Sequence, residues 1–378
     1  MSASTPRKLS IAMIGQKGLP VSKDAGGVER HVEELATRLA ERGHDVLVYV
    51  RPRFTATRDS TYKGVRLQRM PSIPTKSLDT FTHTLLASIS VLFKNVDVIH
   101  YHGIGPASLA WIPRLFKPRA KIIATVHALD WQHPKWGPLA KLYLRYGAWI
   151  AVRVPHATVA VSKNIRAFLK KKYGVDVRYV PNGADLIRDP GAEMLARWGL
   201  EPGGYILNVA RLVKLKGIHY LIDAYGRIAT DKKLVIVGAD EHGNAYADEL
   251  RKVSAGNSSI IFTGFQTDRT LRQLFANAYL YVHPSITEGL SVSILEAMAA
   301  GRCPLVSDIP GNLEPIDHSG ITFVSGDPAD LAEKLQELVN HPEIVAELGK
   351  KARNWVAREY DWDKIVAETE RLYDKVAD

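Results

Sequence analysis

The chain has 378 residues, of which 46% are hydrophobic and 24% are charged, and this length allows two or three domains with sizeable cores. A single cysteine, Cys303, excludes an internal disulfide and any multi-cysteine metal site, so we expect a reducing, cytoplasmic compartment. Residues 1–10 contain no apolar signal-peptide stretch, and the apolar run 85–93 is shorter than the roughly 20 residues that cross a bilayer. We therefore expect no membrane-spanning segment.

The net charge of +10 is unevenly divided along the chain. Residues 1–185 contain 29 Lys and Arg against 12 Asp and Glu, a net of +17, whereas the remainder has a net of −7. No aromatic RNA-binding signature or zinc-finger pattern is present, so nucleic acid is not expected as a partner. Basic residues mix with aromatic ones over 111–119, 131–146 and 165–173, which favours an anionic membrane surface. The alternative is a solvated basic face with buried tryptophans.

Strand-like and helix-like segments alternate through the first half, a pattern typical of a parallel sheet built from βαβ units. A helix over 28–42 places Val32, Leu35 and Leu39 on one face and ends at Gly43. The interval 182–204 is rich in turn residues and is interpreted as a linker. The expected strands are 9–15, 45–50, 96–102, 121–127, 158–162 and 177–181.

A second alternating series follows, so two doubly wound domains facing one cleft are expected. The expected strands are 205–211, 234–239, 260–265, 280–285, 304–308 and 321–325. A short helix is expected over 291–301 and a terminal helix over 360–373. Asp361 and Asp363 form a D-x-D pattern, but they open the terminal helix, where capping and the helix dipole favour Asp, so we interpret them as structural.

Glu288 and Glu296 are separated by apolar and small residues only, in E-G-L-S-V-S-I-L-E. Buried carboxylates require partners, and a nucleotide sugar offers hydroxyls for them and a diphosphate for Arg211 and Lys216. The expected helix begins where a strand ends, which is where open α/β sheets bind anionic ligands. Alternatively, Glu296 is a core carboxylate paired with Arg302 or Arg211, and the two cations are solvated.

The loop after the first strand reads G-Q-K-G-L-P-V-S-K-D-A-G-G-V-E-R and has no G-x-G-x-x-G, which disfavours hydride transfer with NAD. It is either a cleft loop or a mobile surface loop. His127 ends an expected strand and is a candidate active-site residue, although a lone histidine there is more often structural. His100 and His102 are interpreted as core or cleft-wall residues.

Four segments occur in a fixed order: G-G-V-E-R-H-V-E-E-L-A, V-P-N-G-A-D (180–185), R-L-V-K-L-K-G and E-G-L-S-V-S-I-L-E-A-M-A-A-G. This set resembles glycosyltransferase family 4, of the polysaccharide-assembly type and the two-domain α/β GT-B fold. The resemblance implies two Rossmann-like domains around a central cleft. Residues 1–185 would form the acceptor-binding domain, completed by a crossover helix 360–378, and residues 186–359 the donor-binding domain.

The resemblance also implies roles for individual residues. Arg211 and Lys216 would hold the diphosphate, Glu288 the donor-sugar hydroxyls and Glu296 both ribose hydroxyls. His127 would contact the transferred sugar, so that His127 and Glu288 are the catalytic candidates. The remaining assignments are backbone N–H groups of Gly289, Leu290 and Ser291 on the phosphates, Gly264 and Phe265 beside the base, and Gly26 and Gly27 lining the acceptor and phosphate loop. Leu290 and Ser291 differ from the commoner F-G of the family, which bears on the shape of the pocket.

The implied activity is retaining transfer of a hexosyl unit from a nucleotide-diphosphate sugar to a saccharide or lipid-linked saccharide in cell-surface polysaccharide synthesis. No cofactor or metal is expected, and the leaving phosphate would help to deprotonate the acceptor. The protein would act in the cytoplasm or peripherally on the inner face of the cell membrane. Two alternatives remain, a GT-B-fold sugar-nucleotide epimerase and a non-catalytic polyanion- or membrane-binding protein. Base, sugar, acceptor, linkage and oligomeric state stay open at this stage.

Overall fold

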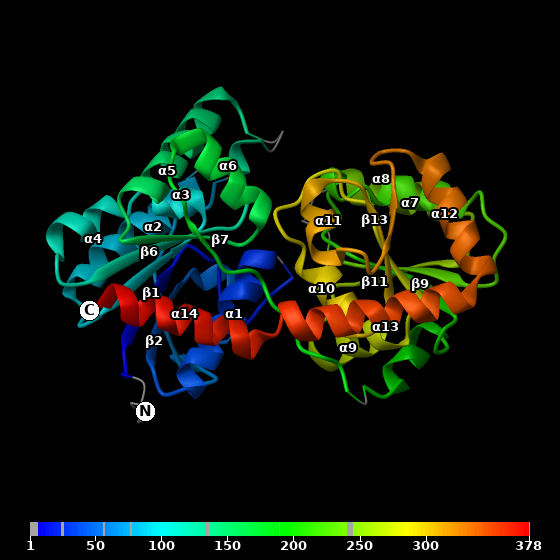
Figure 1. Ribbon diagram of the computed structural model, residues 1–378, viewed down its shortest axis with the longest axis horizontal. Coiled ribbons are helices and arrows are strands. Elements are labelled where there is room, and N and C mark those ends of the chain that lie inside the picture. Colours follow the sequence, from blue (N-terminus) through cyan, green and yellow to red (C-terminus); the bar gives the residue numbers. More distant parts are fainter. Residues whose placement is uncertain are drawn as a thin grey trace. The chain divides into compact units, whose positions relative to one another are not determined.

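The computed structural model describes residues 7–23, 26–55, 57–75, 78–132, 136–188, 190–239 and 245–377. The chain divides into two compact units. Unit 1 comprises Met1–Asn182 and Asp363–Asp378, and unit 2 comprises Gly183–Trp362. Each unit is a sheet with helices on both faces (Figure 1).

The sheet of unit 1 has the strand order β3-β4-β2-β1-β5-β6-β7-β8, and among these strands only β3 pairs in the antiparallel direction. Its strands are β1 (Ser10–Ile14), β2 (Asp45–Val50), β3 (Thr61–Tyr62), β4 (Val65–Arg69), β5 (Val98–His102), β6 (Lys121–Val126), β7 (Ala157–Ala160) and β8 (Arg178–Tyr179). The six strands expected in this half are present. The edge pair β3 and β4 was not foreseen, because V-R-L-Q-R is short and alternates apolar and polar residues without a buried run.

The helices of unit 1 include the expected first helix, α1 (Gly27–Glu41), which buries Val32, Leu35 and Leu39. The others are α2 (Leu78–Ser90), α3 (Ile104–Ala107), α4 (Trp111–Phe116), α5 (Pro138–Arg153), α6 (Lys163–Tyr173) and α14 (Trp362–Ala377), with 3₁₀ turns η1 (Pro52–Phe54), η2 (Val91–Phe93) and η3 (Asp130–Gln132). None of the helices in the described ranges has both the length and the apolar character needed to cross a membrane.

The terminal helix α14 belongs to unit 1, although the chain reaches it only after completing unit 2. The hydroxyl of Tyr373 lies 2.7 Å from Nδ1 of His100 on β5, and Glu370 Oε1 lies 3.0 Å from Nε2 of His44. Arg42 donates to the carbonyl oxygen of Asp363, in the first turn of α14, and lies 3.4 Å from its carboxylate. These contacts give Asp363 a structural partner and secure α14 against the first sheet.

The sheet of unit 2 is parallel throughout its described strands, in the order β11-β10-β9-β12-β13-β14. Its strands are β9 (Tyr205–Val209), β10 (Lys233–Val237), β11 (Ile260–Gly264), β12 (Leu280–His283), β13 (Cys303–Ser307) and β14 (Ile321–Phe323). The helices are α7 (Ile218–Tyr225), α8 (Ala245–Ser254), α9 (Asp268–Asn277), α10 (Val292–Ala299), α11 (Pro310–Ile316), α12 (Pro328–Asn340) and α13 (Pro342–Glu359), with turns η4 (Glu193–Trp198) and η5 (Lys214–Lys216).

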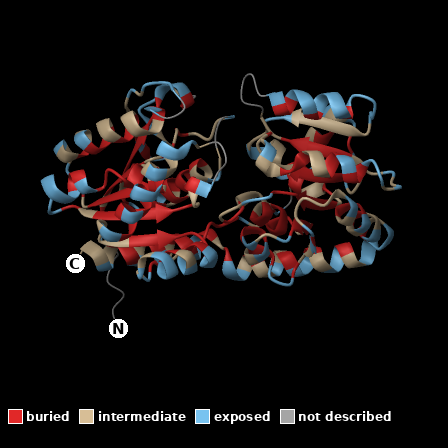
Figure 2. Cartoon of the chain, turned by 90° about the horizontal axis from the view of Figure 1, so that it is seen from above, coloured by how far each residue is buried: buried red, intermediate tan, exposed pale blue. Residues whose placement is uncertain are grey.

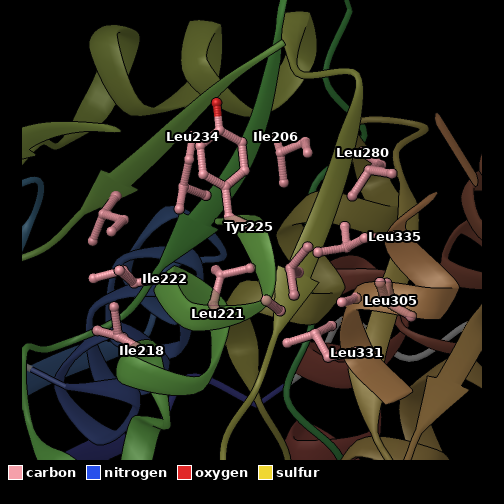
Figure 3. Packing of buried hydrophobic residues seen from close by; sticks show 14 of the residues in the cluster. Ile206, Ile218, Leu221, Ile222, Tyr225, Leu234, Leu280, Leu305, Leu331 and Leu335 are labelled. Carbon is pink, nitrogen blue, oxygen red and sulfur yellow. The ribbon is translucent and has the colours of Figure 1, made fainter. Parts of the chain in front are cut away.

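The core of unit 2 lies between its sheet and the helices α7 and α12. Figure 3 shows strand residues such as Ile206, Leu234 and Leu280 packed with Leu221 of α7 and Leu335 of α12. Figure 2 colours each residue by its burial. The strands of both units are predominantly buried, whereas the helices expose their outer faces.

The segment expected to be a linker, 182–204, packs in part against α9. Leu195 of η4 is buried, and Gln273 accepts a hydrogen bond from the backbone N–H of Met194 and donates one to the carbonyl of Pro190. Turn-rich sequence therefore marks where regular structure stops, whereas the packing of this stretch depends on the distant residue Gln273.

Both sheets reverse their strand order at one point. In unit 2 the chain proceeds from β9 to β10 and β11 on one side, and then continues with β12 on the other side of β9. In unit 1 the equivalent reversal lies between β1 and β5. Ligands of open α/β sheets bind outside the carboxyl ends of the strands at such a point. Ligand-binding sites are therefore expected at the loops that follow β9, β12, β1 and β5.

Candidate active site

The loops that follow β9 and β12 are in direct contact in unit 2. The backbone N–H of Ile286 donates to the carbonyl of Leu215 over 2.9 Å. Gly217 has a φ of +64°, and a Cβ there would lie 2.0 Å from the carbonyl oxygen of Pro284. Only glycine allows this approach, which brings the cation of one loop to the carboxylate of the other.

Glu288 forms the centre of this contact. Its carboxylate pairs with the ammonium of Lys216 and lies 2.8 Å from Nε2 of His283, and its side chain is only 12% exposed. Burial by itself would raise the pKa of Glu288, but the charge of Lys216 and the hydrogen bond from His283 outweigh burial and hold the pKa well below its usual range. Glu288 is therefore an ionised hydrogen-bond acceptor at neutral pH and cannot act as a proton donor.

A chain of hydrogen bonds orients His283 behind the carboxylate. The hydroxyl of Tyr281 lies 2.9 Å from Nδ1 of His283 and 2.9 Å from the hydroxyl oxygen of Ser293 on α10. Burial lowers the pKa of His283, so the ring is neutral at pH 7, and Nε2 is placed to donate to Glu288. Sequence analysis missed His283 and Tyr281, whose signal is a polar residue at every second position of an otherwise apolar strand.

Glu296 lies in the second turn of α10 and is half-buried. Burial is the main reason that the pKa of Tyr281 is raised, and the charges of both Glu288 and Glu296 raise it further. The two carboxylates therefore act on the same hydroxyl group. Arg302, one partner considered for Glu296 from the sequence, donates to the backbone carbonyls of Ala278 and Ala300.

The turn between β12 and α10 carries the residues expected to face phosphates. Leu290 and Ser291 are buried, Gly289 is half-buried, and α10 begins at Val292 directly after them. The first backbone N–H groups of a helix have no partner within the helix, which makes this end suited to an anion. A Cβ on Gly311 of α11 would lie 2.4 Å from the carbonyl oxygen of Glu288, so α11 supports the turn from behind.

The other expected donor residues lie at neighbouring strand ends. Arg211 follows β9 and is half-buried. Gly264 ends β11 with a φ of +72° and has open space where a Cβ would be, and Phe265 beside it is 36% exposed. An accessible aromatic ring at this end of the sheet is compatible with the base position implied by the family resemblance.

In unit 1, the glycine-bearing loop after β1 is secured by two carboxylates of α1, within its described part. Glu29 accepts hydrogen bonds from the backbone N–H groups of Lys17 and Gly26, over 3.0 and 2.7 Å. Glu33 accepts from the backbone N–H of Val21 and from a tyrosine hydroxyl. Gly26 precedes α1 directly and Gly27 is its first residue. These hydrogen bonds tie the described part of the loop to α1.

His127 follows β6 and contacts two further histidines. Its Nε2 lies 3.3 Å from Nδ1 of His102, at the end of β5, and its ring meets that of His31 edge to face at 4.8 Å. Burial lowers the pKa of all three, and for His31 to about 4, so the three imidazoles are neutral at pH 7. His102 thus lines the same site as His127. No local pattern in the sequence predicts the contact of His31 with His127, because the two residues are far apart in the chain.

Two family models match the chain in succession. "Glycosyltransferase Family 4" matches residues 25–188, and "Glycosyl transferases group 1" matches residues 196–355. Together the two matches cover most of the chain, which therefore belongs to the glycosyltransferases of these families, as its sequence segments predicted.

Relatives and solved structures extend the comparison. Glycogen synthase of Mycobacterium tuberculosis is 26% identical over 92% of this chain and 91% of its own length. A GDP-mannose-dependent alpha-(1-6)-phosphatidylinositol monomannoside mannosyltransferase of the same organism is 26% identical over 90% and 93%. Sucrose-phosphate synthase of Thermosynechococcus elongatus has a TM-score of 0.82 at 22% identity, covering 98% and 99%. Anabaena HepE in complex with UDP and glucose has a TM-score of 0.79 at 18% identity, covering 97% and 100%. The fold class is GT-B, as expected.

The buried carboxylate makes a testable contribution to stability. Because folding lowers the pKa of Glu288 below its usual value of 4.5, its stabilising effect is complete above about pH 4.5 and is lost as the pH falls toward the folded-state value. Glu288→Gln should reduce the free energy of unfolding at pH 7 by about 3 kcal/mol, since Lys216 loses its buried partner. The difference from wild type should narrow between pH 4.5 and 3, measured by urea denaturation at each pH.

Glu333→Gln, on the exposed face of α12, provides the control and should change stability little at either pH. A Glu288→Gln deficit that stays constant down to pH 3 would contradict the assignment of an ionised, paired carboxylate.

Proposed function

We propose that this glycosyltransferase moves a hexosyl unit, with retention of configuration, from a nucleotide-diphosphate sugar to a saccharide or lipid-linked saccharide in cell-surface polysaccharide synthesis. The observation that carries the proposal is the buried, ionised Glu288 held between Lys216 and His283 beside the start of α10. This arrangement offers a carboxylate that accepts hydrogen bonds from hydroxyl groups, together with a cation and a helix N-terminus. A sugar diphosphate requires all three.

The donor diphosphate would bind Arg211, Lys216 and the backbone N–H groups of Gly289, Leu290 and Ser291. Lys216 has three N–H donors, so it can keep its contact with Glu288 while binding a phosphate oxygen. As the glycosidic bond breaks, negative charge grows on the leaving diphosphate, and preorganised cations stabilise that charge in the transition state. Glu296 would accept both ribose hydroxyls, and Gly264 and Phe265 would border the base.

Glu288 would orient the donor sugar through its hydroxyls and would not attack the anomeric carbon. Retaining hydrolases position a nucleophile within about 5 Å of a second, protonated carboxyl group. Here the buried carboxylate is committed to Lys216 and His283, which lowers its value as a nucleophile. We propose instead that the acceptor attacks from the side of the leaving phosphate, which takes the acceptor proton. His127 would contact the transferred sugar from unit 1.

The identity of the donor is tested by a thermal-shift screen over UDP, GDP, ADP and dTDP sugars. A ligand that binds the native state raises the melting temperature, by an amount that grows with concentration over Kd. The names of the relatives favour UDP-glucose and GDP-mannose as the first candidates. Rapid consumption of a stabilising donor without any sugar acceptor would instead favour an epimerase, and stabilisation by none of these sugars would favour a non-catalytic binding protein.

Loss of one donor-binding cation should slow the reaction strongly. Arg211→Ala and Lys216→Ala should each lower kcat by about 100-fold or more, as removal of one preorganised electrostatic group commonly does. Lys214→Ala is the matched control, because Lys214 lies exposed in the same turn η5, and its kcat should change less than threefold. Equal losses in all three variants would contradict a specific role for Lys216.

We also propose that transfer requires no divalent metal, because the cations and the helix N-terminus supply the charge that a metal would provide. Activity of the full chain in EDTA should match activity in buffer alone. A loss that magnesium restores would overturn this part of the proposal.

Glu296→Ala should weaken binding of the nucleotide sugar by roughly 10- to 100-fold, because two charge-assisted hydrogen bonds to ribose are lost. The melting temperature of the unliganded protein should stay within about 2 °C of wild type. Calorimetric titration measures the first quantity and differential scanning fluorimetry the second. A melting temperature lowered by several degrees with donor affinity intact would identify Glu296 as a structural anchor instead.

We further propose that unit 1 binds an anionic membrane on the inner face of the cell. Helix α5 exposes Leu139, Leu142, Tyr146 and Trp149, at spacings that place them on one face, and Arg145 is exposed among them. Helix α4 adds exposed Trp111, Leu115 and Phe116. Of the three tryptophans in the basic stretches, Trp111 is exposed, Trp136 is half-buried and Trp131 is buried. Exposed apolar residues mixed with basic ones suit anionic lipid headgroups.

Sedimentation with vesicles tests the membrane proposal. Two variants of unit 1 should each bind anionic vesicles at least tenfold more weakly than wild type. The first is Leu139→Ser with Leu142→Ser. The second is Lys170→Glu with Lys171→Glu and Lys172→Glu on exposed α6, since each basic residue near the surface contributes about 1 kcal/mol. Lys350→Glu with Lys351→Glu, on the exposed face of α13 in unit 2, is the matched control and should retain binding. Equal binding to neutral vesicles, or binding unchanged in 0.5 M salt where the Debye length is roughly 4 Å, would contradict the proposal.

A further inference from the structure

His31, His102 and His127 form a cluster of three buried imidazoles in unit 1. One ring nitrogen from each lies within 4.8 Å of the corresponding nitrogens of the other two. The three residues come from α1, the end of β5 and the residue after β6, so the strand pairing of β5 with β6 brings two of them side by side. No acidic residue shares this group within the described ranges.

The atoms of the cluster are arranged as metal ligands require. Two nitrogens bound to a tetrahedral zinc ion, each about 2.0–2.1 Å from it, lie about 3.3 Å apart. His102 Nδ1 and His127 Nε2 lie 3.3 Å apart. The other separations lie within 4.8 Å and must contract by roughly 1–2 Å when an ion binds.

Neighbouring groups select the form of the imidazoles that binds metal. Nδ1 of His31 lies 3.0 Å from the amide oxygen of Asn182, which makes Nδ1 the donor and leaves the lone pair on Nε2. His100, which stacks beside His102, is different, because its two nitrogens contact Tyr373 and Thr125.

We propose that His31, His102 and His127 form a binding site for one divalent transition-metal ion of the zinc class, with water in the fourth position. Three histidines are a recognised ligand set for zinc, and neutral imidazole favours zinc and its neighbours over magnesium or calcium, which prefer oxygen. The inference goes beyond the proposed transfer reaction, which uses no metal. His127, with 9% of its surface exposed, is the most accessible of the three and marks the side from which an ion enters.

The site has a functional consequence that rests on the proposed role of His127. Zinc bound at Nε2 of His127 would occupy that nitrogen and place an ion where the transferred sugar is proposed to bind, so zinc should inhibit transfer, whereas magnesium should not. Zinc would thereby act as a reversible inhibitor at the sugar end of the active site.

The experiment is a calorimetric titration of Zn²⁺ into the full chain after removal of metals with a chelator. Wild type should bind one ion. His31→Gln and His102→Gln should each weaken binding at least 100-fold, whereas His83→Gln, a buried histidine of α2 outside the cluster, should bind as wild type does. Far-UV circular dichroism establishes that the variants are folded. Co²⁺ added to wild type should give the intense visible absorption of a tetrahedral site, a readout that needs no variant.

Absence of saturable binding, binding retained in His31→Gln and His102→Gln, or a weak octahedral Co²⁺ spectrum would each overturn the site. Inhibition of transfer by Zn²⁺ that EDTA reverses supports both the site and the role of His127. Binding of one Zn²⁺ through these histidines without inhibition would instead overturn the proposed contact between His127 and the sugar, so the two ideas fail separately.

Discussion

A buried negative charge at Glu288 is the constraint on which the candidate site in unit 2 depends. An isolated carboxylate in that position would be neutralised by protonation, because desolvation of the charged form costs several kcal/mol. Lys216 and His283 prevent this by meeting it from the loop after β9 and from β12 itself. The site therefore requires that β9 and β12 be neighbours, which they are at the point where the strand order reverses.

Close packing of backbone maintains that arrangement. Gly217 lies against Pro284, and Gly311 lies against Glu288, so both ends of the turn carrying the carboxylate are held by contacts that no side chain could occupy. The hydroxyl of Tyr281, which contacts His283 on the same strand, then connects β12 to Ser293 of α10. The charged groups are consequently preorganised before any ligand binds, which is the condition under which electrostatic groups contribute most to a transition state.

The two units present different chemistry at equivalent positions of similar sheets. The reversal in unit 2 carries a cation and an anion, whereas the one in unit 1 lies beside a group of neutral imidazoles and a glycine loop held by Glu29 and Glu33. A charged partner suits a diphosphate, and neutral nitrogen ligands suit a soft cation or the hydroxyls of a sugar. The two units therefore present different ligand-binding chemistry.

The sequence by itself determined the repeated βα pattern, the twelve expected strands, the terminal helix and the family, because periodicity and ordered short segments are local properties. It also identified Glu288, Glu296, Arg211 and Lys216 as candidates. Only the tertiary structure decided that Glu288 pairs with Lys216 and His283, that 182–204 packs on Gln273, and that His31 joins His102 and His127. Apart from the one between Glu288 and His283, which are near each other in sequence, these contacts join residues far apart in the chain, and strand order, which no local pattern encodes, brings them together.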